Sequence, residues 1–184
     1  MKKMLVFTLI LSLVLAMPAF AEADDNVIHA DQIDWSEEAE KAFVDAGYSG
    51  TWTTLEGIGC EMIIPDDYVQ QELTDQDRAD NYAFIFANAE NGGKIEVFDS
   101  YIEGIEDLES LGKALQEKSP ENPVQYAFIN GAAAVINSVE DYDMSSAIFD
   151  LGNSRFVQIM FTPMSKSTQL LVLCMASIKF PLAG

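Results

Sequence analysis

Basic residues and histidine are scarce in this chain of 184 residues. It contains 10 Lys and Arg against 30 Asp and Glu, which gives a formal net charge of −20 at pH 7. Nucleic acids and anionic lipid surfaces are bound through cationic patches, so this balance argues against both as partners. A single histidine excludes any site built from several histidines. His29 lies in a polar, acidic segment, and we interpret it as solvated rather than as part of a catalytic triad.

Cysteine is also scarce, and the two cysteines together with one His are too few for a structural zinc site. Cys60 lies in a predicted strand on the same face as Met62, and Cys174 lies in a predicted helix beside Leu171. Both therefore face the expected core. Cys60 and Cys174 could meet and form a disulfide if that helix covers that strand. The alternative is two buried free thiols, because Cys packs as a small apolar residue.

The common catalytic and nucleotide-binding motifs are missing. The chain has no G-x-x-x-x-G-K-[ST], H-E-x-x-H, C-x-x-C or G-x-S-x-G. Gly57 and Gly59 match the start of a dinucleotide-binding turn, but Met62 stands where the third Gly is required. Residues 110–113 match S-x-x-K, but Leu111 belongs to an amphipathic stripe. The sequence therefore predicts a protein that is not an enzyme, with no catalytic residue and no cofactor.

The 30 acidic residues leave two alternatives open. A pair of carboxylates could hydrolyse a glycoside by acid–base catalysis. The stretches 75–80 and 140–143 are rich in Asp, but an EF-hand counted from Asp75 needs Gly and Glu where Asp80 and Phe86 stand. The simpler interpretation is that these acids cap helices and turns. A carboxylate-based hydrolase and a calcium-dependent structural protein remain the alternatives, and no metal ligand is assigned.

Residues 1–21 have the three parts of a secretory signal peptide. Two lysines precede the apolar run 4–17, and Ala19 and Ala21 stand at positions −3 and −1 of a cleavage site before Glu22. The apolar run is shorter than the about 20 residues of a membrane span. Cleavage leaves 8 basic and 30 acidic residues, a charge of −22. We expect a secreted, extracytoplasmic bacterial protein with no stable membrane insertion.

The remaining chain alternates helical and strand patterns. Residues 22–34 are polar and acidic, which predicts a linker. Apolar residues at three- and four-residue spacing predict helices over 36–46, 105–118 and 166–178. Alternating and β-branched segments predict strands over 51–54, 57–64, 82–87, 94–101, 124–129, 132–139, 145–150 and 155–161.

Tight turns join successive predicted strands. Asn91-Gly92-Gly93 and Asn130-Gly131 tolerate positive φ, which favours hairpins and therefore antiparallel pairing. The sequence predicts one α+β domain over 35–184, an α/β/α sandwich with a mainly antiparallel sheet of about six strands flanked by helices.

Several of these segments resemble proteins of the Mog1/PsbP-like fold. Residues 59–65, Gly-Cys-Glu-Met-Ile-Ile-Pro, are similar to the opening strand pattern G-x-x-φ-x-φ-P of that fold. The helix over 105–118, the hairpin at 130–133 and the closing Ala-Ser-Ile at 176–178 are similar to the same scheme. Residues 161–165, Phe-Thr-Pro-Met-Ser, resemble the strand-to-helix junction of small secreted Firmicutes proteins without an assigned function.

The resemblance covers about residues 50–182 and implies an antiparallel sheet between helices. Its known members are assembly or accessory proteins: one supports the photosynthetic oxygen-evolving complex, and another binds a nuclear GTPase. The resemblance therefore implies a binding role, but it carries no functional residue to this chain, because function depends on sites built onto a fold.

These observations together predict an exported, non-catalytic binding or accessory module of the bacterial cell envelope or extracellular space. Its partner would be a protein or an extracellular ligand. Tyr48 and Trp52 flank a glycine turn and are the candidate partner surface, because exposed aromatic patches suit interfaces.

Overall fold

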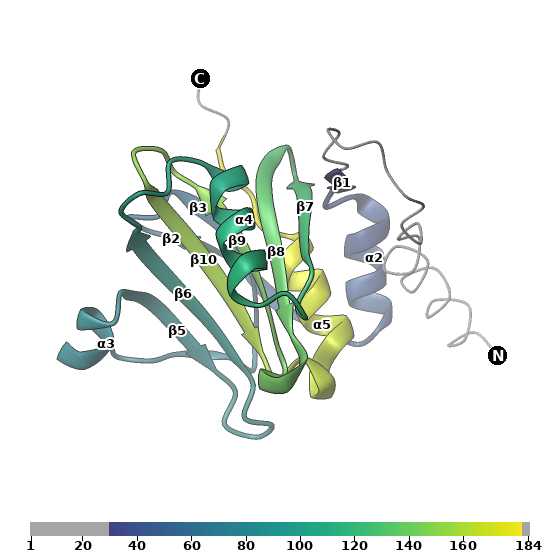
Figure 1. Cartoon of the computed structure of the whole chain (residues 1–184). Helices are drawn as coiled ribbons and strands as arrows, with labels where there is room; N and C mark the ends of the chain where they lie inside the picture. The colour runs from purple at the N-terminus through teal and green to yellow at the C-terminus, as the bar shows by residue number, and fades with distance from the viewer. Residues whose placement is uncertain (1–29, 182–184) are drawn as a thin grey trace.

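The computed structural model describes residues 30–181, except for the side chains of residues 166 and 167 (Figure 1). The expected signal peptide lies outside the described residues. The helices are α2 (Glu37–Asp45), α3 (Asp75–Ala79), α4 (Leu108–Lys118), α5 (Met164–Ala176) and the short 3-10 turn η1 (Glu140–Tyr142). The strands are β1 (Ala30–Ile33), β2 (Gly50–Leu55), β3 (Cys60–Pro65), β4 (Val69–Gln70), β5 (Tyr82–Ala87), β6 (Lys94–Tyr101), β7 (Val124–Ile129), β8 (Ala132–Val139), β9 (Met144–Asp150) and β10 (Arg155–Thr162).

Eight strands form one mixed sheet in the order β1-β7-β8-β9-β10-β6-β5-β4. Its pairings are antiparallel except for β1, which runs parallel to β7. The expected number of about six strands is therefore wrong. The two additional edge strands, β1 and β4, are short and mostly exposed. They form by backbone pairing to a neighbour, which requires no alternation of apolar side chains in their own sequence.

The β2–β3 hairpin is a separate two-stranded sheet that does not join an edge of the main one. It packs with α5 on one face of the main sheet, and α2 contacts α5 there (Figure 1). The larger apolar core lies between these layers. Its fully buried members include Leu55, Met62, Ile95, Ile129, Val157, Ile159, Phe161, Leu171 and Ile178.

Helix α4 lies on the opposite face of the main sheet, against β7 and β8. A smaller core of Leu111, Val135, Ile148 and Phe156 fills this layer. Gly112 permits the close contact, because a Cβ there would lie 2.2 Å from the hydroxyl of Tyr126. The sheet therefore has helices on both faces, as the sequence predicted, but α4 covers only part of its face.

Two segments expected to lack regular structure contain some. Strand β1 lies inside the stretch 22–34 that we expected to be a linker, and β4 and α3 lie inside the turn-rich stretch 66–80. Helix α4 starts at Leu108, three residues later than predicted, because Asp107 accepts a 2.8 Å hydrogen bond from the Ser110 N–H. Among the described residues, no helix is long and apolar enough to cross a membrane.

The acid-rich stretches act as caps, as the simpler interpretation of the sequence predicted. Asp77 forms a reciprocal capping box with Thr74 at the start of α3. Asp143, at a positive φ of 51°, accepts a 2.7 Å hydrogen bond from the Ser165 N–H near the start of α5. Among the described residues, no three His, Cys, Asp or Glu side chains are grouped as metal ligands.

Candidate functional site

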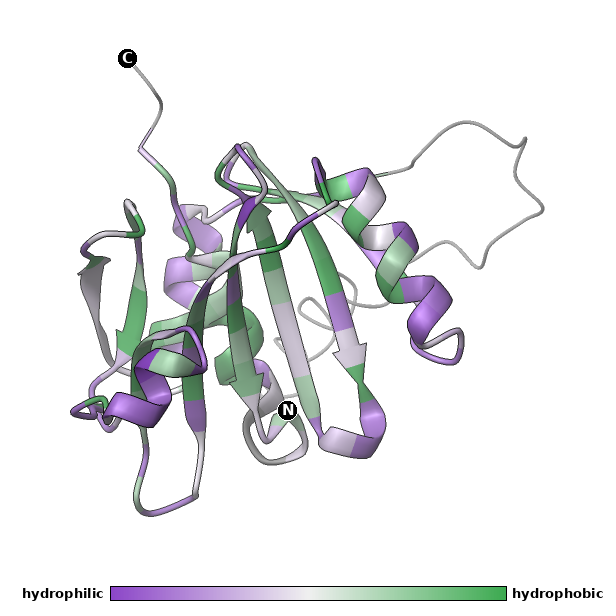
Figure 2. Ribbon diagram, turned by 60° about the vertical axis from the view of Figure 1, so that its left-hand side comes forward, coloured by the Kyte–Doolittle hydropathy of each residue, from purple (hydrophilic) through white to green (hydrophobic). Residues whose placement is uncertain are grey.

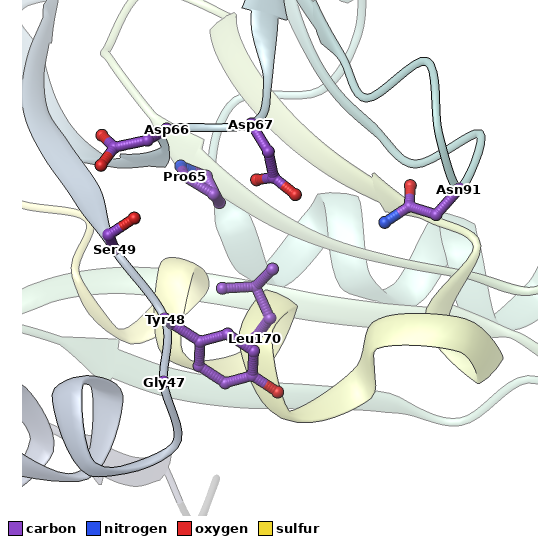
Figure 3. Close-up of a pocket in the computed structure, with 8 residues that line it drawn as sticks. All are labelled: Gly47, Tyr48, Ser49, Pro65, Asp66, Asp67, Asn91 and Leu170. Carbon is purple, nitrogen blue, oxygen red and sulfur yellow. The ribbon is translucent and has the colours of Figure 1, made fainter.

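A surface cleft of about 570 Å³ opens where four segments meet on the α5 side of the main sheet. Residues 47–49 come from the loop between α2 and β2, and residues 65–67 are the last residue of β3 and the two that follow it. Asn91 belongs to the β5–β6 hairpin, and Leu170 to α5. Figure 3 shows the side chains of Asp67 and Asn91 pointing toward each other, with Leu170 below them.

Backbone and side-chain hydrogen bonds hold the loops that line the cleft. Gly47 ends α2 at a φ of +83°, which a glycine adopts without strain. The N–H of Asp66 donates to the Ser49 carbonyl oxygen at 3.1 Å and so ties the two loops together. The side chain of Asn88 accepts from the N–H groups of Glu90 and Asn91 at 2.8 and 3.3 Å, which shapes the hairpin tip.

Asp66 and Asp67 give the cleft its charge. Oδ1 of Asp66 accepts from the Thr51 hydroxyl at 3.1 Å, and Oδ2 of Asp67 accepts from the Asn88 amide at 2.5 Å. The described residues donate no hydrogen bond to the second oxygen of either carboxylate. Both residues are exposed, so these oxygens are open to a ligand from solvent.

Tyr68 lies buried beneath this acidic turn. Its side chain ends beside Gly93, and its hydroxyl has no hydrogen-bond partner among the described residues. Burial, followed by the charge of Asp67, raises the pKa of Tyr68 to about 12. Burial, again followed by Asp67, raises the pKa of Cys174 to about 12. Both groups are therefore neutral at physiological pH, and neither is poised to act as a nucleophile or a base.

The cleft can therefore bind a positively charged group. It offers carboxylate oxygens, an amide, the hydroxyl groups of Tyr48 and Ser49, and the apolar side chain of Leu170. Oxygen acceptors beside an apolar surface suit an ammonium or guanidinium group on an aliphatic stem.

The structure separates the two residues predicted as a partner surface. Tyr48 is half-buried and lines the cleft, and burial raises its pKa. Trp52 lies on β2 and is 38% exposed, with the Lys179 ammonium 4.0 Å from the centre of its ring. The rings of Trp35 and Phe43 lie between those of Tyr48 and Trp52, and the centroids of successive rings are 5.7 to 6.2 Å apart. The partner-surface assignment stays a prediction.

Both cysteines face the core, as predicted. Cys60 on β3 is 1% exposed, Cys174 on α5 is 0% exposed, and α5 packs against β3. They are free thiols in the structure. Burial raises the pKa of Cys60 to about 12, with the charge of Glu61 as a smaller cause.

Sequence reasoning missed Asp66, Asp67 and Asn91 as site residues. Asp66 and Asp67 directly follow a strand that ends in proline, and we interpreted them as an ordinary turn. Asn91 was predicted as a hairpin residue, and the hairpin forms as expected. Nothing in the sequence indicates that these two turns meet beside α5, because their contact depends on the β2–β3 hairpin stacking on the sheet.

Comparison with known proteins identifies the fold. No protein-family model matches the chain, and no curated protein matches it. The solution structure of cyanobacterial PsbP from Synechocystis matches with a TM-score of 0.51 and 12% identity, covering 72% of this chain and 93% of that one. At this identity the match shows the fold alone, and the chain has the Mog1/PsbP-like fold that its sequence segments resemble.

Two further structures show weaker similarity. The Ran-binding protein Mog1p of Saccharomyces cerevisiae matches with a TM-score of 0.42 and 11% identity, covering 72% of this chain and 95% of that one. A crystal structure from Bacteroides thetaiotaomicron matches with a TM-score of 0.46 and 14% identity, covering 73% of this chain and 50% of that one.

Proposed function

We propose that the protein is an exported, non-catalytic binding module that recognises a positively charged group of an extracytoplasmic protein partner. The observation that carries this proposal is the cleft of Figure 3, where Asp66 and Asp67 each present a carboxylate oxygen that receives no hydrogen bond from the described residues. Lys and Arg side chains complement such oxygens, and the net charge of −22 that remains without residues 1–21 steers cationic surfaces toward the molecule.

The signal-peptide pattern of residues 1–21 supports export, and the accessory roles implied by the Mog1/PsbP-like resemblance support binding. Export is tested by isolating the protein from the culture medium or envelope fraction of its source cells and measuring its intact mass. The proposal expects a chain that starts at Glu22. A chain that retains residues 1–21 and sediments with the inner membrane would contradict it.

The cleft is tested by NMR titration with N-acetyl-lysine amide. Its control is the same molecule acetylated at the side-chain amine, which lacks the charge. The proposal expects saturable shifts of the backbone amides of Ser49, Asp66, Asp67 and Asn91 with the charged probe alone. Asp67→Asn should weaken this binding, and Glu117→Gln, an exposed acid on α4, should leave it unchanged.

Two outcomes would overturn the cleft assignment. The first is equal binding of the charged and the acetylated probe. The second is shifts that map elsewhere on the protein. Calcium chloride serves as a further probe, because a rise in melting temperature in its presence would favour the calcium-dependent alternative instead.

A further inference from the structure

The α4 side of the main sheet has a region that α4 leaves uncovered. In strands β9, β10 and β6, the residues Ile148, Gln158 and Phe98 are register partners, and so are Ser146, Met160 and Glu96. Paired residues point to the same face of a sheet. Ile148 belongs to the small core beneath α4, so the other side chains of both rows lie on the same face as α4.

The two rows continue onto β5 through Tyr82, the partner of Phe98, and Ile85, the partner of Glu96. Tyr82, Ile85, Phe98 and Met160 are all half-buried, and the rings of Tyr82 and Phe98 lie 4.3 Å apart. None of the four belongs to the packed core of α4. Figure 2 shows this part of the sheet between α3 and α4. We refer to Tyr82, Ile85, Glu96, Phe98, Gln158 and Met160 as the open sheet face.

Glu96 lies in the middle of the open sheet face and is 7% exposed. The described residues donate no hydrogen bond to its carboxylate. Among the described residues, the one ionic partner of Glu96 is Lys94, whose side chain is 51% exposed. The Lys94 Nζ lies 3.9 Å from Oε1 of Glu96, which is beyond hydrogen-bond distance. Burial raises the pKa of Glu96, and Lys94 lowers it by a smaller amount.

A nearly buried carboxylate without hydrogen bonds destabilises a folded protein. The neighbouring Gln158 does not bond to Glu96 either, because its side-chain amide donates to the Ser146 hydroxyl at 3.0 Å. A partner that supplied both positive charge and hydrogen-bond donors would satisfy the carboxylate. The apolar side chains around it would at the same time bury further surface against that partner.

We propose that the open sheet face binds a segment of a partner protein that places an arginine on Glu96, with apolar side chains on either side of that arginine. The planar guanidinium donates two parallel hydrogen bonds to a carboxylate and stacks on aromatic rings, and Tyr82 and Phe98 lie beside Glu96. A second copy of this chain is a poor occupant, because two mature molecules with 8 basic and 30 acidic residues, a charge of −22 each, repel each other.

This surface is separate from the cleft. The cleft includes Leu170 of α5, which belongs to the larger core on the other side of the sheet. The two surfaces share no residue, so the binding test of one surface can fail while that of the other succeeds.

The probe for the open sheet face is the blocked tripeptide Ac-Leu-Arg-Leu-NH2, titrated into the mature protein and followed by the backbone amide signals. Its control is the same peptide with citrulline, the neutral isostere of arginine. The proposal expects saturable shifts at Glu96, Phe98 and Met160 with the arginine peptide at millimolar concentrations. It expects affinity about tenfold or more lower for the citrulline peptide, because hydrogen bonds to charged groups contribute most to such contacts.

Two variants with opposite expected effects on the affinity for the arginine peptide test the assignment. Glu96→Gln keeps the shape of the side chain and should lower the affinity for the arginine peptide about tenfold or more. Lys94→Gln removes the neighbouring positive charge and should strengthen binding of the same peptide. Retention of the wild-type spectrum outside β5, β6 and β10 confirms that each variant folds.

The proposal is overturned if the arginine and citrulline peptides bind equally, if Glu96→Gln retains the wild-type affinity, or if no saturable shift occurs. Shifts confined to Asp66, Asp67 and Asn91 would also overturn it and would place the arginine in the cleft instead.

Discussion

The side chain of Asn130 accepts a 2.6 Å hydrogen bond from the backbone N–H of Trp35, which lies 95 residues earlier in the chain. The Nδ2 group of the same side chain donates to the carbonyl oxygens of Ala176 and Ile178 at 2.8 and 2.7 Å. One residue in the β7–β8 turn thus joins the entry of α2 to the end of α5.

Replacing Asn130 with Ala should lower the free energy of unfolding by about 2–4 kcal/mol, because three hydrogen bonds of about 1 kcal/mol each are lost. Urea denaturation measures the change. Asn153→Ala is the matched control, since Asn153 has a similar positive φ of 55° and its side chain bonds to none of the described residues. A loss for Asn130→Ala no larger than for Asn153→Ala would mean that backbone conformation, rather than the bonds, explains the effect.

Gly93 is required by the buried ring of Tyr68. A Cβ at position 93 would lie 2.2 Å from the Tyr68 hydroxyl and 3.0 Å from its Cζ, and Tyr68 is 5% exposed. Gly93→Ala should therefore destabilise the protein by about 1–3 kcal/mol. Tyr68→Phe alone should be neutral or stabilising by up to about 1 kcal/mol, because it removes a buried hydroxyl without a partner.

The double variant with both Tyr68→Phe and Gly93→Ala completes a double-mutant cycle. In the Tyr68→Phe background, Gly93→Ala should lose less stability than in the wild type, because the nearest clashing atom is gone. Thermal unfolding of the four proteins measures the coupling. Additive effects would show that the hydroxyl is not what makes Gly93 necessary.

Three buried acids predict a loss of stability at alkaline pH. The pKa values of Cys60 and Cys174 rise from about 9 to about 12, and that of Tyr68 from 10 to about 12. Above pH 9 the unfolded chain releases these protons more readily than the folded one. The free energy of unfolding should therefore fall as the pH rises from about 9 to about 12.

Urea midpoints measured across this alkaline range test the prediction. Cys174→Ala lowers the starting stability by creating a small cavity, but it should make the fall with pH shallower. An identical slope in wild type and variant would show that Cys174 ionises equally easily in both states.

Glu96 predicts a similar fall in stability with rising pH, but between acidic and neutral pH. Burial raises its pKa above the ordinary value of about 4.5, so the folded chain holds this proton more strongly than the unfolded one. Stability associated with this group is complete below pH 4.5 and is lost as the pH rises through the folded pKa. Glu96→Gln should therefore be more stable than wild type at pH 7 and equal to it near pH 4.

Comparison of the two proteins by denaturant unfolding at both pH values measures this difference. Glu117→Gln, on the exposed face of α4, is the control and should change little at either pH. If Glu96→Gln were less stable at pH 7, the carboxylate would have a stabilising role that its contacts do not indicate.

The sequence predicted much of the fold. Tyr82–Ala87, Lys94–Tyr101, Val124–Ile129 and Ala132–Val139 form strands with the predicted bounds. Local physics is enough here, because alternating apolar residues and turn residues with positive φ act over a few positions. The strands that were missed, β1 and β4, are short edge strands. The pairing partner of β1 lies far away in the sequence, and β4 has only two residues, which is too short to show a strand pattern.

Both surfaces required the tertiary structure. Glu96 alternates with the core residues Ile95 and Val97, so by pattern it reads as an ordinary solvent-facing acid. Its burial depends on neighbours from β5 and β10, which only sheet packing brings beside it. Asp67 and Asn91 likewise stand 24 positions apart, and the stacked hairpin brings them to one cleft.

The sequence by itself therefore determined the acidity, the export expectation, the scarcity of histidine and cysteine and most strands and helices. These properties depend on composition and on short-range periodicity. Tertiary structure alone decided which acids are solvated and which are desolvated. That distinction is set by atoms from distant segments, and the electrostatic energy of a carboxylate depends on those atoms far more than on its neighbours in sequence.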